Sequence, residues 1–228
     1  MEILSFERFL NESVGTDVDS IVYGNPTAEL HMIETRPNDI KDWFIRNGHA
    51  ETIIRECPKN SGQTTQADLQ EVLRKMENAS DVDIAFAKAA EDNLVKTFVD
   101  FIIDKGHTAT ETECNAIVEQ TDPLLFFLKN AINRPRPYQL AYALDLSLYP
   151  LIHTDANSAA YPSGHAYDSY NIARYFAQKY PDIAEDCMDF AEKIAETRIY
   201  TGIHYPSDNR VSKKISDMLW ENNLLDHA

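Results

Sequence analysis

Residues 161–165 read Tyr-Pro-Ser-Gly-His and predict the start of a helix that presents a histidine. Ser163 is a favourable N-cap residue, and Gly164 allows the backbone to come close to a ligand. Helical spacing of apolar residues continues from Gly164 until Pro181 interrupts it. The unpaired N–H groups and the positive dipole end of such a helix would lie beside His165. The stretch therefore predicts an anion site with a proton donor next to it.

Five further residues of the C-terminal half have the types that phosphoryl chemistry requires: Lys129, Arg136, Arg198, His204 and Asp208. The lysine and the two arginines can neutralise the non-bridging oxygens of a phosphate. One histidine can attack phosphorus while the other protonates the leaving oxygen. A carboxylate close to the attacking histidine fixes its tautomer and stabilises its cationic form. Arg198 continues an apolar helical stripe, so we expect its side chain to point inward.

The spacing of these residues resembles the three signatures of the PAP2 (type 2 phosphatidic acid phosphatase) superfamily. That superfamily includes class A bacterial acid phosphatases and vanadium haloperoxidases. The first signature, K-x6-R-P, is similar to Lys129 through Arg136-Pro137, and the second, P-S-G-H, to residues 162–165. The third, S-R-x5-H-x3-D, is similar to residues 197–208, with Thr197 in place of the usual serine. The signatures occur in the family's order, and the resemblance implies a helical bundle.

The resemblance implies a phosphatase that works through a covalent phosphohistidine. His204 would be the nucleophile, Asp208 would orient it, and His165 would protonate the leaving alcohol and then activate the attacking water. Five residues would bind the phosphate: Lys129, Arg136, Ser163, Gly164 and Arg198. The family needs no metal or other cofactor, and the sequence contains no clear metal-ligand cluster of its own. The implied partner is a small phosphorylated substrate, namely a phosphomonoester.

Two regions depart from the family pattern. Residues 209–214 lack the small residues that are common after the third signature, which leaves the packing of the last helix open. The first 120 residues resemble no family signature. The lipid phosphatases of the superfamily are excluded as close relatives, because this sequence lacks their membrane spans.

Two other functions are compatible with the same residues. A vanadium-dependent haloperoxidase would hold vanadate in the same oxyanion cage, with His204 linked to the metal, although the short chain favours the phosphatase. A non-catalytic member of the fold would only bind an anion or serve a structural role. The presence of both histidines and of Asp208 argues against that alternative, although Asp208 could also simply cap the last helix.

Each cation also has an ordinary structural interpretation. Lys129 could be a solvated residue at a helix end, and Arg134 could be another or a contact at the rim of the pocket. Arg198 could pair with Glu192 or Glu196, which precede it on the same helix. The occurrence of all these residues in one pattern favours the functional interpretation.

The composition is that of a globular protein with an acidic surface. The chain has 228 residues and a formal net charge of −16, from 21 Lys and Arg against 37 Asp and Glu. Such a charge argues against nucleic acid or an anionic membrane as a partner. No apolar run reaches the roughly 20 residues of a membrane helix. The N-terminus lacks the basic start and apolar core of a secretory signal.

The cysteines are few and have no spacing typical of metal ligands. Cys57, Cys114 and Cys187 lie far apart in the sequence, so we expect free thiols in a reducing compartment. Together with the N-terminal sequence, they predict a cytoplasmic protein.

Helical spacing dominates the chain and no alternating strand pattern occurs, so we predict an all-α fold. We expect helices at residues 40–47, 66–78, 81–104, 110–120, 122–133, 164–180, 183–200 and 206–223, with a short helix and a loop over 138–163. Residues 1–60 would form an irregular or helical extension packed on a helical catalytic domain, residues 61–228. The amphipathic segment 1–12 could dock on that domain or mediate a homo-oligomer.

Overall fold

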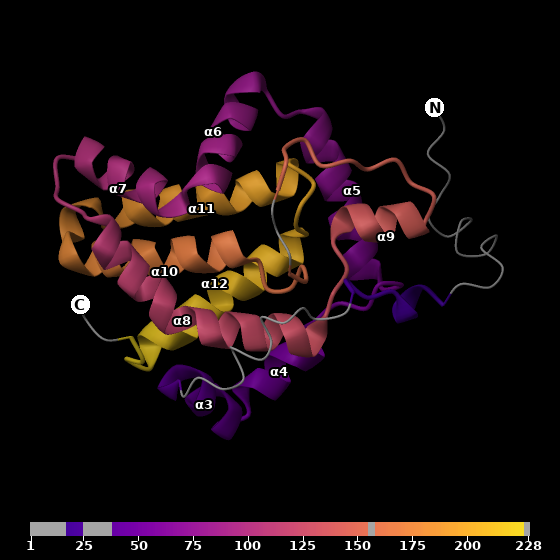
Figure 1. Cartoon of the computed structure of the whole chain (residues 1–228), viewed down its shortest axis with the longest axis horizontal. Coiled ribbons are helices and arrows are strands. Elements are labelled where there is room, and N and C mark those ends of the chain that lie inside the picture. The colour runs from indigo at the N-terminus through magenta and orange to yellow at the C-terminus, as the bar shows by residue number, and fades with distance from the viewer. Residues whose placement is uncertain (1–16, 25–37, 155–157, 226–228) are drawn as a thin grey trace.

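The computed structural model describes residues 17–24, 38–154 and 158–225, and these residues form helices and no strands. Ten α-helices of the described residues carry the labels of Figure 1: α3 (Asp39–Arg46), α4 (His49–Glu56), α5 (Gln63–Glu77), α6 (Asp81–Asp92), α7 (Leu94–Asp104), α8 (Glu111–Ile132), α9 (Pro137–Ala143), α10 (Gly164–Lys179), α11 (Ala184–Tyr200) and α12 (Pro206–Glu221). Two short 3-10 helices are η1 (Val18–Ser20) and η2 (Pro181–Ile183). The prediction of an all-α fold is confirmed. Within the described ranges, every helix is too short or too polar to cross a membrane.

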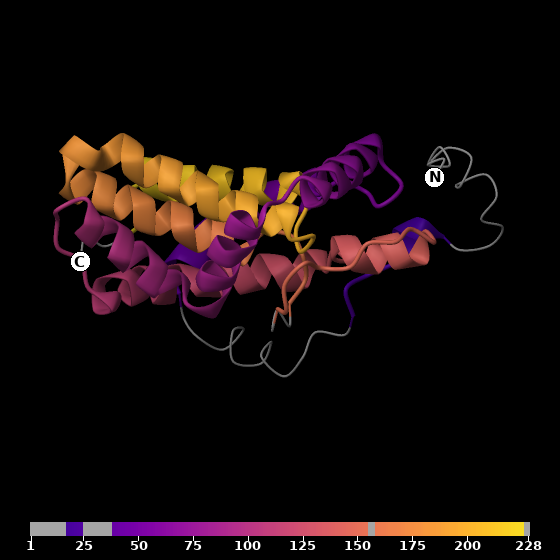
Figure 2. The ribbon, with the colours of Figure 1, turned by 90° about the horizontal axis from the view of Figure 1, so that it is seen from above.

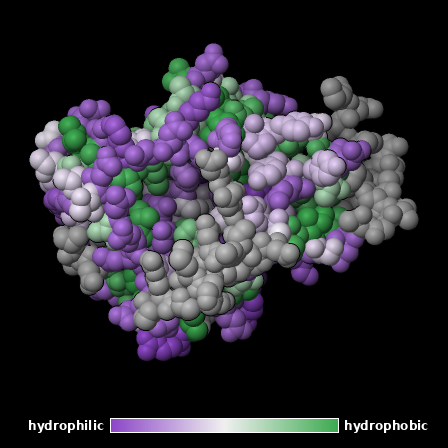
Figure 3. All heavy atoms as spheres, viewed as in Figure 1, coloured by the Kyte–Doolittle hydropathy of each residue, from purple (hydrophilic) through white to green (hydrophobic). Residues whose placement is uncertain are grey.

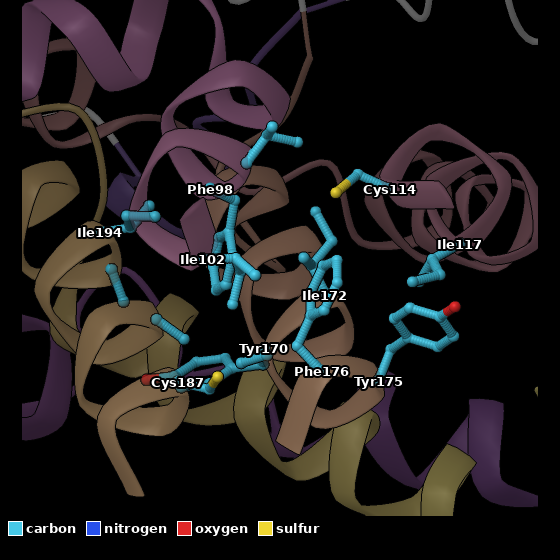
Figure 4. Close-up of a cluster of buried hydrophobic side chains, with 14 of the residues drawn as sticks. Phe98, Ile102, Cys114, Ile117, Tyr170, Ile172, Tyr175, Phe176, Cys187 and Ile194 are labelled. Atoms are coloured by element: carbon cyan, nitrogen blue, oxygen red, sulfur yellow. The ribbon is translucent and has the colours of Figure 1, made fainter. Parts of the chain in front are cut away.

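Helix α10 is the centre of the fold, because it packs against α8, α11 and α12. Figure 4 shows the apolar cluster that α10 shares with α7, α8 and α11. Phe98 and Ile102 of α7 and Phe176 of α10 are fully buried there. Burial of each such side chain contributes about 1.5–3 kcal/mol relative to exposure. This packing fixes the positions of the C-terminal helices relative to one another. On the face shown in Figure 3, the described surface over them is mostly polar.

The connections between the central helices bring distant segments together. Helices α8 and α11 run toward the end of the bundle from which α10 and α12 start. The α8–α9 link, the segment before α10 and the α11–α12 loop therefore gather at this end, facing α9. Figure 2 shows α9 continuing beyond the end of α8. Residues in three separate stretches of sequence are thus brought to one place.

Helix α8 runs through Pro123, so the prediction of two helices at 110–120 and 122–133 is wrong. Proline lacks the N–H of a helical hydrogen bond and normally breaks a helix. Here the hydroxyl of Thr121 donates to the carbonyls of Ile117 and Val118, at 3.0 and 3.2 Å. Leu124, like the rest of the apolar face beyond the proline, is buried. Tertiary packing therefore outweighs the local effect of the proline.

The predicted helix 81–104 is also wrong, because it divides into α6 and α7 at Asn93. The backbone of Asn93 is extended, with φ −159° and ψ 90°. Its side chain accepts a hydrogen bond from the Lys96 N–H at 2.8 Å and so caps α7. The break lets α6 pack on α11 while α7 packs on α8 and α10.

Helices α3 and α4 pack on the main bundle. Phe44 of α3 and Ile53 of α4 are buried in one cluster with Leu128 of α8 and Ile215 of α12. The sequence did not predict α4, which follows Gly48 in the left-handed conformation, with φ 73°. The division at residue 60 stays a prediction, and the proposed helix 1–12 lies outside the described residues.

The three cysteines are free, as predicted. Cys114 and Cys187 are buried and Cys57 is half-buried. Burial raises the pKa of the Cys114 thiol to about 12 and that of Cys187 to about 11. Both thiols are therefore protonated and unreactive at neutral pH.

We expect Phe44→Ala to lower the free energy of unfolding by about 3–5 kcal/mol, because it leaves a cavity between α3 and the bundle. The matched control is Ile45→Ala, because that neighbouring side chain is 45% exposed. Urea unfolding followed by circular dichroism measures both. Equal, small losses would show that α3 does not contribute to the core.

Candidate active site

The structure brings together the eight residues that the sequence analysis singled out. Each lies at an end of a helix on the connection side of the bundle: Lys129 in the last turn of α8, Arg136 before α9, Ser163, Gly164 and His165 at the start of α10, Arg198 in the last turn of α11, His204 before α12, and Asp208 in its first turn. Six of them are buried, whereas Gly164 and His165 are partly exposed.

The imidazole of His204 is held at both nitrogens. Nδ1 lies 3.1 Å from Oδ2 of Asp208, and Nε2 lies 2.8 Å from Nη1 of Arg136. An arginine can only donate, so Nε2 must accept and the ring proton must lie on Nδ1. Burial, and then the charges of Arg136 and Lys129, hold the pKa of His204 well below 6.5. The neutral ring therefore directs a lone pair from Nε2 toward the cations.

Asp208 combines two roles. Its Oδ2 accepts from the backbone N–H of Tyr205 at 2.9 Å, which caps α12, and also faces His204. Its Oδ1 accepts from Nη1 of Arg134 at 2.6 Å. Burial raises the pKa of Asp208 to about 6, and the charge of Arg134 limits that rise. The aspartate is therefore ionised at neutral pH.

Arg134 is a residue that the sequence analysis undervalued. It is 2% exposed, so the interpretation as a solvated residue is wrong. Besides Asp208, its guanidinium donates to Ser207 Oγ at 2.7 Å and to Thr65 Oγ1 at 3.0 Å. It also lies over the ring of Tyr205, with Cζ 3.9 Å from the ring centroid. Its spacing from Asp208 in the sequence gives no local signal of this contact.

Lys129 and Arg136 are buried cations held by backbone carbonyls. Lys129 Nζ donates to the carbonyl of Ala159 at 2.6 Å. Arg136 donates to the carbonyl of Ser158 from Nε and Nη2, at 3.0 and 2.8 Å. Burial, together with the neighbouring cations, lowers the pKa of Arg136 to about 10 and that of Lys129 well below 10.5. The site thus concentrates positive charge that an anion would stabilise.

Ser163 precedes α10 as predicted, but its side chain does not cap that helix. Its carbonyl accepts from the Ser212 hydroxyl at 2.8 Å, whereas its own Oγ is buried with no hydrogen-bond partner among the described residues. A Cβ added to Gly164 would lie 3.9 Å from Cε of Lys129. The chain therefore approaches Lys129 closely at Gly164, and the unpaired Ser163 hydroxyl is a group that an oxyanion could satisfy.

His165 is the more exposed of the two histidines: its side chain is 28% exposed, whereas that of His204 is 3% exposed. Burial, and then the charges of Arg198, Arg136 and Lys129, lower the pKa of His165 well below 6.5. The nearby backbone of Ala90 acts in the opposite direction. The ring is therefore neutral in the absence of an anion.

Arg198 points inward, as expected, but it pairs with neither Glu192 nor Glu196. Its Nη1 donates to Oε2 of Glu91, in α6, at 2.5 Å. Glu91 lies in the part of the chain that resembles no family signature, and nothing in the sequence indicates that it contacts Arg198. Nε of Arg198 is buried and has no partner within the described ranges.

The part of the chain that the structure describes contains no group of three or more His, Cys, Asp and Glu side chains placed to hold a metal ion. Asp168 is half-buried and interacts with Lys129, and Asp122 is a half-buried carboxyl next to Asp168. Burial raises the pKa of Asp122 to about 6 and that of Asp168 well above 3.8. Asp168 is therefore a weak counter-charge for the lysine.

No protein-family model and no curated protein matches the chain. Among solved structures, the chain is similar to a transmembrane PAP2-type phosphatidylglycerolphosphate phosphatase from Bacillus subtilis. The two share 15% identity over 77% of this chain and 92% of the other, with a TM-score of 0.49. A similarity this low assigns no function, so any assignment depends on the residues of the site.

We expect Arg134→Met to lower the free energy of unfolding by about 3–5 kcal/mol, because it leaves Asp208 buried without its cation. Arg210→Met is the matched control: Arg134 and Arg210 both pair with Asp68, but the side chain of Arg210 is 60% exposed. Its loss should stay below about 1 kcal/mol. Similar losses in urea unfolding would contradict the role given to Arg134.

We also expect His204 to be neutral at pH 7 with its proton on Nδ1. Because its pKa is lowered, this form should persist as the pH falls through 6.5, where an ordinary histidine gains a proton. Two-bond ¹H–¹⁵N NMR spectra of the imidazole measure both properties. A proton on Nε2, or an imidazolium at pH 7, would contradict the assignment.

Proposed function

We propose that this protein is a metal-independent phosphatase of the PAP2 superfamily, which hydrolyses phosphomonoesters through a phosphohistidine on His204. The observation that carries the proposal is the hydrogen bonding of His204. Asp208 fixes the proton on Nδ1, and the lone pair of Nε2 faces a cluster of buried cations. This is the form of imidazole that can attack phosphorus.

Substrate binding would use the buried cations of the site and its unpaired hydroxyl. Lys129, Arg136 and Arg198 would neutralise the phosphate oxygens, and Ser163 Oγ would add a hydrogen bond. Arg136 would transfer its Nη1 donor from His204 to a phosphate oxygen, which releases the lone pair of Nε2. The greater exposure of His165 favours a leaving group directed past this ring toward solvent.

In the first step, Nε2 of His204 forms the N–P bond while the P–O bond to the alcohol breaks. His165 donates a proton to the departing oxygen. The bound dianion offsets the cations that lower the pKa of His165, so that the ring is protonated in the substrate complex. Asp208 stabilises the positive charge that His204 gains.

In the second step, His165 takes a proton from water while the water oxygen attacks phosphorus. The N–P bond breaks, phosphate leaves, and His204 returns to its neutral form. No step requires a metal. The cations act by stabilising the charge on the phosphoryl oxygens, which is the main requirement of such a transfer.

The test is hydrolysis of p-nitrophenyl phosphate by the full chain. We expect His204→Ala to lower kcat/KM for this substrate by about 10²–10⁴-fold or more, and His165→Ala to cause a loss of that size for glycerol 2-phosphate, whose alcohol leaving group needs a proton. His107→Ala is the matched control, because this histidine pairs with Asp182 outside the site. Phosphohistidine should be trapped by quenching ³²P-labelled substrate in alkali, and His204→Ala should abolish the label.

Unchanged activity in both variants would refute the proposal. Halide oxidation by peroxide that depends on added vanadate, without phosphate release, would assign the haloperoxidase function. Phosphate binding without turnover on aryl and alkyl esters would assign a non-catalytic anion site.

A further inference from the structure

Glu91 places a carboxylate against two members of the site, and the mechanism above gives it no role. Its Oε2 accepts from Nη1 of Arg198 at 2.5 Å and lies 3.6 Å from Nε2 of His165. The Glu91 side chain is only 14% exposed. An ion pair this far from solvent is screened little, so the charge of Glu91 acts on both neighbours.

The charges that face His165 are otherwise positive. Lys129 comes from α8, Arg136 from the start of α9 and Arg198 from α11. Each of these disfavours a protonated ring, and His204 lies on the same side. Asp208 is engaged by Arg134 and His204, so within the described ranges Glu91 supplies the carboxylate within 4 Å of the His165 ring.

Helix α6 contacts the same ring a second time. The backbone of Ala90 lies near His165 and favours its protonated form. Ala90 and Glu91 belong to the last turn of α6, where the unpaired carbonyls carry the negative end of the helix dipole. The end of α6 therefore offers His165 both a fixed acceptor and a negative charge.

Glu91 also determines how Arg198 can meet a ligand. The ion pair occupies Nη1 and leaves Nε, which is buried without a partner among the described residues. A guanidinium fixed at one nitrogen presents its remaining N–H groups in one plane. One carboxylate thus orients the cation and supports the proton on the neighbouring ring.

We propose that Glu91 is a positioning residue, which favours protonation of His165 once the phosphate is bound and orients Arg198 toward that phosphate. The proposal rests on the phosphatase function proposed above. It also has a consequence for binding, because the same carboxylate repels the phosphate dianion. Glu91 would therefore favour proton donation and weaken affinity for the product.

The test variant is Glu91→Gln, which keeps a hydrogen-bond acceptor for Arg198 and removes the charge. Asp92→Asn is the matched control, because it removes a charge from the next, exposed residue of the same helix. Two substrates separate the roles. Glycerol 2-phosphate has an alcohol leaving group that needs a proton, whereas p-nitrophenolate leaves without one.

We expect Glu91→Gln to lower kcat/KM for glycerol 2-phosphate about tenfold or more and to change that for p-nitrophenyl phosphate less than about threefold. The alkaline limb of kcat for glycerol 2-phosphate should move to lower pH by about 1. Inorganic phosphate should inhibit the variant more strongly than the wild type. Asp92→Asn should show none of these changes.

An NMR titration of His165 with and without inorganic phosphate gives a readout that does not depend on turnover. The pKa of His165 should fall by about 1 in Glu91→Gln, because a nearby opposite charge is lost. Equal losses on both substrates with an unchanged His165 pKa would overturn the inference and leave Glu91 a structural role. Faster hydrolysis of both substrates would also overturn it, because the carboxylate would then merely compete with substrate. If the wild type hydrolysed neither substrate, the phosphatase proposal would fail, while the titration would still decide whether Glu91 supports the proton on His165.

Discussion

The ion pair between Arg134 and Asp208 is the interaction on which the site depends. A buried carboxylate is stable only with a cation and hydrogen bonds around it. Arg134 occupies Oδ1, so that Oδ2 is left for His204 and for the start of α12. The other end of the guanidinium reaches Thr65 in α5. One pair of charges therefore joins α5, the α8–α9 link and α12, and fixes the tautomer of the histidine.

The site contains more buried positive charge than the carboxylates around it neutralise, and this excess is what would attract an anion. Burial and the neighbouring cations lower the pKa values of Lys129 and Arg136, whose hydrogen-bond partners are carbonyl dipoles rather than carboxylates. Such groups reduce stability unless an anion is bound, as is common where a fold serves a function. The apolar packing around α10 offsets this cost and keeps the cations in place while no anion is present.

The sequence predicted the fold class better than the boundaries of the helices, and the residues that it singled out lie together in the structure. Periodicity located α5, α10, α11 and α12 because their apolar residues recur at helical spacing. It failed at Pro123 and Asn93, where tertiary contacts outweigh or replace the local signal. The signature residues could be singled out because their types and spacing reflect chemistry. Arg134 and Glu91 could not, because their partners are about 74 and 107 residues away in the sequence.

The contacts of Arg134 and Glu91 show that the two halves of the chain contribute different groups to the site. The C-terminal signatures supply the atoms that would touch a phosphate. The N-terminal half, which resembles no signature, supplies Thr65 to the guanidinium of Arg134 and Glu91 to Arg198 and His165. The break at Asn93 allows α6 and α7 to point in different directions. The last turn of α6 can therefore contact the start of α10. The part of the sequence without a signature therefore supplies contacts to the residues to which we assign the chemistry.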